Sequence, residues 1–189
     1  MRWTVFFIFA YLALIMQVGM EKLLAFGEDR VTPSFLLILG VYIGMAAPPM
    51  TTAWALFILG LFADLTRHYL TGDDQVVWLI GPGALGMLAG AVVVVQLRVM
   101  MYRNSIIAMA LMVFVVGIFS NLVSIAMVTS RGLAWAPTDG IAMWNAADEL
   151  VRQFHEVVYT TIVAIPIGAI LLRLLPLWRF QPLKSKGPR

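Results

Sequence analysis

The sequence predicts an all-α, polytopic membrane protein: a single domain built as a bundle of about six transmembrane helices. Two observations carry this prediction. Hydrophobic residues make up 61% of the 189 positions and charged residues only 12%, and the mean hydropathy of +0.91 is far above that of a soluble domain. The charged residues, together with the proline pair Pro48 and Pro49, also divide the chain into six apolar stretches, which at roughly 20 residues each fill about two thirds of its length.

The six expected spans lie between these charged residues. The first starts just after Arg2 and has no small-x-small cleavage site before Glu21, so we expect it to stay as a helix and not to be removed as a signal peptide. The expected spans are residues 4–20, 33–47, 50–63, 76–97, 105–128 and 157–177.

The second and third spans belong to one uncharged run, residues 31–63. As a single helix this run would measure roughly 50 Å, against a hydrocarbon core of about 30 Å. We expect it to turn back at Pro48 and Pro49, because consecutive prolines remove backbone donors and disfavour helical geometry in the preceding residue. Each half is short for a full span, so a re-entrant hairpin shielded by neighbouring helices remains an alternative.

The basic residues predict the orientation of the bundle. In the six-span layout, eight of the 13 lysines and arginines fall on the side of the N-terminus and five on the other side, which places both termini on the cytoplasmic side of the membrane. All ten acidic residues fall on the outer side. Because the basic residues cluster at span ends and in the tail, the net charge of +3 reflects membrane topology and contact with the lipid bilayer, and we expect no nucleic-acid binding.

An amphipathic helix is expected before the last span, at residues 140–156. Trp144, Val151 and Phe154 share one face of it. Charged residues at i,i+4 spacing lie on another face: Asp148, Arg152 and Glu156. This segment is either an interfacial lead-in to the last span or a docking surface for an extracytoplasmic partner.

Catalytic patterns are missing from the sequence. There is no cysteine, and the two histidines, His68 and His155, are far apart and have no neighbour at metal-ligand spacing. There is also no Gly-x-Ser-x-Gly turn that would carry a nucleophile. Gly81-Pro82-Gly83 lacks the lysine of a phosphate loop and is expected to bend or start the fourth helix. We therefore expect no enzyme, no metal site and no cofactor.

Small and polar residues in the spans provide the candidate sites. Two Gly-x-x-x-Gly pairs, Gly40 with Gly44 and Gly86 with Gly90, predict close helix packing, either within the chain or against another subunit. Asp64 follows a long apolar run, and its carboxylate is expected at the interface, paired with Arg67, unless it has a functional role. Asn121 is expected to form a hydrogen bond between helices.

The order of these features resembles the MreD family, the small membrane subunit of the machinery for bacterial rod shape and lateral cell-wall elongation. The resemblance rests on size, on the six-helix layout, on the hairpin that starts at residues 33–39 (PSFLLIL) and on residues 59–65 (LGLFADL), which are similar to the family's Gly-Leu-Leu-x-Asp-Leu motif. A glycine-bearing fourth helix and a final helix with Tyr159 and Pro166 also fit.

The resemblance implies a non-enzymatic scaffold. Members of the family bind MreC and, through it, associate with cytoskeletal MreB and with the peptidoglycan synthase pair of a SEDS glycosyltransferase and a transpeptidase. The Gly-x-x-x-Gly faces and the outer helix, with Trp144, Val151 and Phe154, would then supply binding surface for the partner.

Two alternatives remain. In size and helix number the expected bundle also resembles the substrate-binding S component of an energy-coupling-factor vitamin transporter, although Ala10 and Ala13 do not have the Ala-x-x-x-Ala spacing that such proteins use for docking. An intramembrane hydrolase that uses Asp64 with Asp73 or Asp74 is the other alternative.

Overall fold

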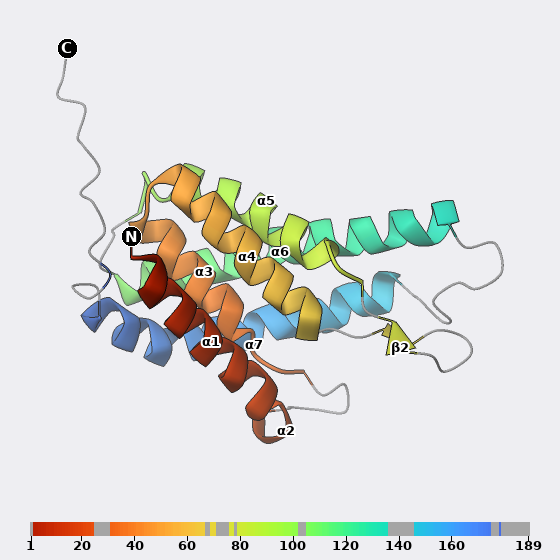
Figure 1. The fold of residues 1–189 in the computed structure, drawn as a ribbon, viewed down its shortest axis with the longest axis horizontal. Coiled ribbons are helices and arrows are strands. Elements are labelled where there is room, and N and C mark those ends of the chain that lie inside the picture. The colour runs from red at the N-terminus through yellow and green to blue at the C-terminus, as the bar shows by residue number, and fades with distance from the viewer. Residues whose placement is uncertain are drawn as a thin grey trace, which may run out of the picture.

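The computed structural model describes residues 2–24, 31–66, 69–70, 76–77, 79–101, 105–135, 146–174 and 178. These residues are almost entirely helical (Figure 1). The helices are α1 (Trp3–Gly19), α2 (Glu21–Leu24), α3 (Phe35–Ala46), α4 (Pro49–Thr66), α5 (Pro82–Leu97), α6 (Ile106–Trp135) and α7 (Ala146–Arg173). Two strands of two residues each, β1 (Tyr69–Leu70) and β2 (Val76–Val77), pair antiparallel between α4 and α5.

Three helices are long and apolar enough to cross a membrane: α4, the Ile106–Ser130 part of α6, and α7. Helices α1, α3 and α5 are also apolar but shorter, with 17, 12 and 16 residues. The structure therefore confirms that the described residues form mainly apolar α-helices, three of which are long enough to cross a membrane.

Helix α3 forms the centre of the bundle. All 12 of its residues are buried, and it packs against α1, α4, α5, α6 and α7. A helix of this length rises only about 18 Å, less than a hydrocarbon core of about 30 Å. Irregular backbone at membrane depth is tolerated where other helices enclose it, and α3 is enclosed on all sides.

The turn expected at Pro48 and Pro49 is present. Ala47, with φ −91° and ψ 161°, is extended, as a residue before proline prefers to be. Pro49 then opens α4, a position where its missing N–H costs nothing. The uncharged run therefore folds as two antiparallel helices, α3 and α4.

Helices α1, α3, α4, α5, α6 and α7 alternate in direction. We call the end of the bundle where α4 ends and α5 begins the Asp64 end, and the opposite end the Arg98 end. The start of α1 and the finish of α7 lie at the Arg98 end (Figure 1). Trp178 is fully buried there, with its ring against those of Phe9 and Tyr42.

One expected boundary is wrong. The fourth helix begins at Pro82 and not at residue 76, because Gly81 has a φ of 125°, which interrupts a right-handed helix, and Val76–Val77 form β2. Helix α6 continues to Trp135, and the part of it that is long and apolar enough to cross a membrane, Ile106–Ser130, agrees with the expected span 105–128 to within two residues. The outer amphipathic segment and the last span form one continuous helix, α7; residues 140–145 of the expected segment lie outside the described residues.

Candidate functional site

Asp64 caps the N-terminus of α5. Its side chain is only 3% exposed, and its two carboxylate oxygens accept hydrogen bonds from the backbone N–H groups of Gly81 and Gly83, both at 2.7 Å, and of Ala84 at 3.2 Å. Pro82 has no N–H. Every backbone N–H group at the start of α5 that has no partner within the helix is therefore bound by Asp64. The negative charge of Asp64 also faces the positive end of the helix dipole.

Two glycines allow α4 and α5 to come close enough for this cap. A Cβ atom on Gly60 would lie 2.6 Å from Ala84 Cα, and one on Gly83 would lie 2.3 Å from Asp64 Oδ1. Gly60 and Asp64 are four residues apart on α4 and therefore share one helix face. The stretch of residues 59–65 thus provides a contact surface for the start of α5, and the pairing expected with Arg67 falls outside the described residues.

The N-terminus of α3 is capped at the same end of the bundle. The Ser34 hydroxyl accepts from Leu37 N–H, and the side-chain oxygen of Gln17 on α1 accepts from Leu36 N–H, both at 3.4 Å. The backbone N–H of Ser34 donates to the Thr160 hydroxyl of α7 at 2.9 Å. Side chains from α1 and α7 therefore hold the start of the central helix.

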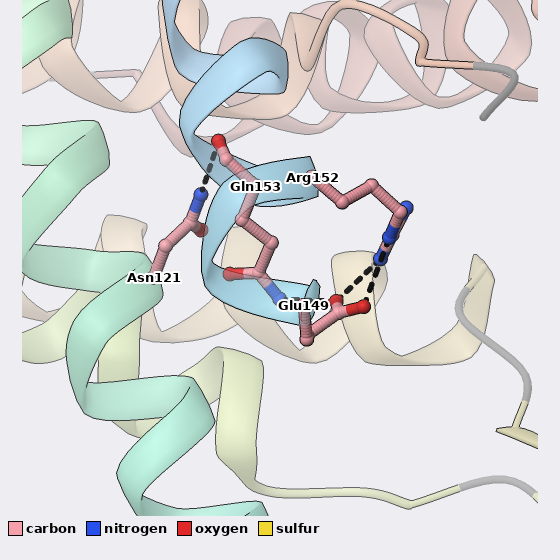
Figure 2. Close-up of polar contacts among 4 residues, drawn as sticks. All are labelled: Asn121, Glu149, Arg152 and Gln153. Atoms are coloured by element: carbon pink, nitrogen blue, oxygen red, sulfur yellow. Dashed lines mark hydrogen bonds and ion pairs between the residues drawn. The ribbon is translucent and has the colours of Figure 1, made fainter. Parts of the chain in front are cut away.

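Two side chains of α6 form hydrogen bonds to other helices at the Asp64 end of the bundle. The Ser124 hydroxyl donates to the carbonyl of Pro82 at 2.9 Å, which ties α6 to the start of α5. The Asn121 amide donates to the carbonyl of Gln153 on α7 at 3.5 Å (Figure 2). The expected interhelical hydrogen bond of Asn121 is therefore present. With Ser120 and Glu156, which lie beside them, these side chains form a polar layer at the Asp64 end, made of Gln17, Ser34, Asp64, Ser120, Asn121, Ser124, Gln153, Glu156 and Thr160.

A small cavity lies within this polar layer. It is bounded by side chains from α3 to α7 and has a volume of about 20 Å³, enough for roughly one water molecule. The side chains with oxygen atoms that line it are Ser34, Ser120, Asn121, Ser124, Glu156 and Thr160.

The Arg98 end carries the complementary cap. One guanidinium nitrogen of Arg98, just after α5, donates to the carbonyl of Gly44 at 3.0 Å and also to the carbonyl of Ala47. These carbonyls belong to the last turn of α3, the negative end of its dipole. A cation at this place satisfies acceptors that the turn at Pro48 leaves without helical partners.

The four expected packing glycines all lie in contacts within the chain. An added Cβ would meet Leu56 at Gly40, Val94 at Gly44, a serine pair of α6 at Gly86 and Val116 at Gly90. Gly40 and Gly44 are themselves in the buried centre of the bundle. Helix packing within the chain therefore occupies these positions, and we do not assign a partner surface to them.

The expected outer face is partly described. Val151 is 55% and Phe154 is 49% exposed on α7, whereas Trp144 lies outside the described residues. The guanidinium of Arg152 binds the carboxylate of Glu149, three residues earlier, a pair that the sequence analysis did not single out (Figure 2). Gln153 donates to the same carboxylate at 2.6 Å.

No family model, curated protein or solved structure matches this chain. Among the described residues there is also no group of three histidine, cysteine, aspartate or glutamate side chains that could hold a metal ion. Asp73 and Asp74, the partners considered for Asp64 in a hydrolase, lie outside the described residues. Asp64 itself faces three backbone donors, which suits a structural carboxylate and not a general base.

Sequence reasoning missed Ser34, Gln153 and Thr160 as members of the polar layer. Thr160 lies four residues after Glu156 on α7, so the two residues had helical spacing. This periodicity of polar residues in apolar helices was a usable signal. The caps made by Gln17 and Arg98 had no such signal, since each reaches a helix that is distant in sequence.

Proposed function

We propose that this chain is a non-enzymatic scaffold subunit of the bacterial cytoplasmic membrane that docks an MreC-like partner of the cell-elongation machinery. In this proposal α1, α3, α4, α5, α6 and α7 form the six-helix membrane bundle, with both termini cytoplasmic and the Asp64 end outward. The alternating directions of these helices and the excess of basic residues on the side of the N-terminus support this orientation.

The proposal rests on a row of exposed apolar side chains along α7, a helix that is longer than a membrane span. The 28 residues of α7 rise about 42 Å, whereas about 20 residues cross the hydrocarbon core. Counting back from Arg173, the first two turns of α7 lie beyond the core. Leu150, Val151 and Phe154, each about half exposed, lie on these turns or at the boundary.

The same row continues inside the core through exposed residues of α7: Val158, Ile162 and Ile165. Lipid covers apolar side chains within the core, but water would meet those at Leu150 and Val151. An exposed apolar patch in water marks an interaction surface. A partner helix that leaves the membrane and continues outward could cover the whole row.

An MreC-like protein has this form, because it consists of one membrane helix followed by a coiled coil and an external domain. Through such a partner the chain would be linked to MreB and to the glycosyltransferase and transpeptidase pair. The scaffold proposal therefore combines the family resemblance with the length and exposure of α7.

Two observations favour the scaffold over the vitamin-binding S component. Ala10 is fully buried, so it is not available on α1 for docking a transport subunit. Within the described residues, the cavity in the polar layer has room for about one water, so this cavity does not take a vitamin, since ligand pockets measure roughly 300–1,000 Å³. Asp64, engaged by three backbone donors, likewise gives no support to the hydrolase alternative.

Co-purification of tagged MreC from the same organism tests the docking surface. We expect the double variant Leu150→Ser and Phe154→Ser to recover about tenfold less of this chain than the wild type, which corresponds to about 1.4 kcal/mol of binding energy. Leu23→Ser is the matched control, because Leu23 is 78% exposed on α2 at the same end of the bundle. Unchanged recovery of a folded double variant would refute the surface.

Cysteine labelling tests the orientation, since the chain has no cysteine of its own. In intact spheroplasts, a membrane-impermeant maleimide should label Leu23→Cys at the Asp64 end. Val99→Cys, at a site 84% exposed near the Arg98 end, should react only after the membrane is permeabilised. The reverse pattern would invert the proposed topology.

A further inference from the structure

The Arg98 end of the bundle presents exposed basic side chains. The start of α1 and the finish of α7 lie at this end (Figure 1), with Arg2 just before α1 and Arg173 as the last residue of α7, and both side chains are exposed. Neither guanidinium forms an ion pair with any residue that the structure describes. Arg98 differs from them, because its guanidinium already binds carbonyls at the end of α3.

Apolar side chains are exposed beside these charges. Met100 and Val99, in the turn after α5, are 87% and 84% exposed, more than any other large apolar side chain in the described residues. Trp3, the first residue of α1, is also exposed, and tryptophan prefers the boundary between the hydrocarbon core and water. Basic residues next to exposed apolar ones are typical of segments that lie among the headgroups of anionic lipids.

Trp178 holds the beginning of a further basic segment at the same end. Its side chain is fully buried, and its ring centroid lies 5.0 Å from that of Phe9 on α1 and 5.6 Å from that of Tyr42 on α3. The next 11 residues of the sequence, RFQPLKSKGPR, include four basic residues and no acidic one. Because the residue directly before them is fixed in the bundle, covalent connectivity keeps these charges at the Arg98 end.

Trp178 also connects this basic segment to α1. Among the described elements, α1 packs only against α2, α3 and α4, and one side of it carries exposed residues such as Phe7, Tyr11 and Ile15. The ring contact between Phe9 and Trp178 therefore joins the segment after α7 to a helix that has few other neighbours. Binding of this segment at the membrane surface would favour the state in which α1 is packed on α3.

We propose that the Arg98 end binds the phosphate groups of anionic phospholipids, and that Trp178 transmits this binding to the packing of α1. Arg2, Arg173 and the basic residues after Trp178 are the ligands, because guanidinium groups form paired hydrogen bonds with phosphate oxygens. An acidic protein fits less well, since Val99 and Met100 need an apolar environment beside the charges, which acyl chains provide.

The place of this site in the cell rests on the orientation proposed above. In that orientation the Arg98 end faces the cytoplasmic leaflet, whose negative surface potential attracts basic segments. In detergent micelles both ends of the bundle meet the same lipids. A binding test in micelles is therefore independent of the orientation, which cysteine labelling measures separately.

Thermal unfolding of the purified full chain in micelles tests the site, with increasing amounts of phosphatidylglycerol or of zwitterionic phosphatidylcholine. We expect phosphatidylglycerol to raise the unfolding temperature in a saturable way and by more than phosphatidylcholine, because the folded chain brings together charges that the unfolded chain holds apart. Each basic residue near an anionic surface strengthens binding roughly fivefold. Arg173→Gln should therefore raise the half-saturating concentration of phosphatidylglycerol about fivefold, whereas Lys22→Gln, on α2 at the Asp64 end, is the matched control and should keep the wild-type value.

Trp178→Ala separates lipid binding from its effect on the bundle. In native mass spectrometry this variant should still retain phosphatidylglycerol, because its charges are unchanged, but its unfolding temperature should no longer depend on the lipid. Trp178→Phe keeps an aromatic ring and should keep most of the dependence, which leaves the link testable if Trp178→Ala fails to fold. A folded Trp178→Ala with the wild-type dependence would remove Trp178 as the link.

A direct count of bound lipid decides the binding itself. From an equal mixture of the two lipids, wild-type protein should retain more phosphatidylglycerol in native mass spectrometry, and the triple variant Arg173→Gln, Lys184→Gln and Lys186→Gln should bind it roughly 100-fold more weakly. Equal retention of the two lipids together with equal unfolding temperatures would overturn the proposal and leave the basic surface to an acidic protein. An equal rise of the unfolding temperature with inorganic phosphate would show a site for free anions and not for lipid.

Discussion

Replacing Asp64 by alanine should destabilise the bundle more than any change to a surface carboxylate. The substitution removes both acceptor oxygens from the start of α5 and leaves the N–H groups of Gly81, Gly83 and Ala84 without their partner. These donors lie beside a side chain that is only 3% exposed, so water does not replace the carboxylate easily. The helix also loses the negative charge at the positive end of its dipole.

The magnitude follows from the number of donors. Each buried donor left unsatisfied costs about 1–3 kcal/mol. Three such donors set an upper range of about 3–9 kcal/mol. Replacing an ordinary N-cap residue by alanine costs about 0.5–2 kcal/mol, so for this buried cap with three donors we expect about 3 kcal/mol or more. Asp64→Asn keeps one acceptor oxygen and should cost about 1–3 kcal/mol.

The assay is equilibrium unfolding in mixed micelles with increasing SDS, followed by near-ultraviolet circular dichroism. Asp148→Ala is the control, because Asp148 is exposed on α7, and it should cost about 0.5 kcal/mol or less. Hydrogen exchange at Gly83 and Ala84 gives a local readout and should accelerate in Asp64→Ala. If Asp64→Ala unfolds at the same SDS fraction as Asp148→Ala, the cap does not stabilise the bundle and our reading of it is wrong.

Two further substitutions test the close contact of α4 with α5 and the cap of α3. Gly60→Ala should cost about 1–3 kcal/mol of unfolding free energy, because its Cβ would lie 2.6 Å from the backbone of Ala84, whereas Gly19→Ala, with open space around it, should cost nothing measurable in the same SDS titration. Arg98→Met should cost about 1.5–3 kcal/mol through the loss of its bonds to the carbonyls of α3, and Arg98→Lys should recover part of that; equal stability of Arg98→Met and wild type would contradict the cap.

The sequence predicted the helices well because their signals are local. Long apolar runs separated by charges define the helices, and Pro48 with Pro49 defines the turn between α3 and α4. The start of α5 was misplaced because Val76 and Val77 are as apolar as the helix that follows, and hydropathy does not distinguish a strand from a helix over two residues. Gly81 and Pro82 indicated the correct start of α5, because glycine interrupts a helix and proline is favoured as the first helical residue.

The sites were harder to predict because they depend on contacts between distant segments. Asp64 was recognised as unusual in an apolar run, but its partners lie 17 to 20 residues later on another helix. A hydrogen bond from Asn121 to another helix was predicted, but no feature of the nearby sequence identified the carbonyl of Gln153 as its acceptor. The cavity needs five elements to be placed together, which spacing along one helix does not provide.

Helix length explains several of the polar side chains inside this bundle. α3 and α5 rise about 18 Å and 24 Å, less than a hydrocarbon core of about 30 Å, so their ends need partners from within the protein. Asp64, Arg98 and Gln17 meet this need, because each binds backbone groups at the end of a helix that is distant in sequence.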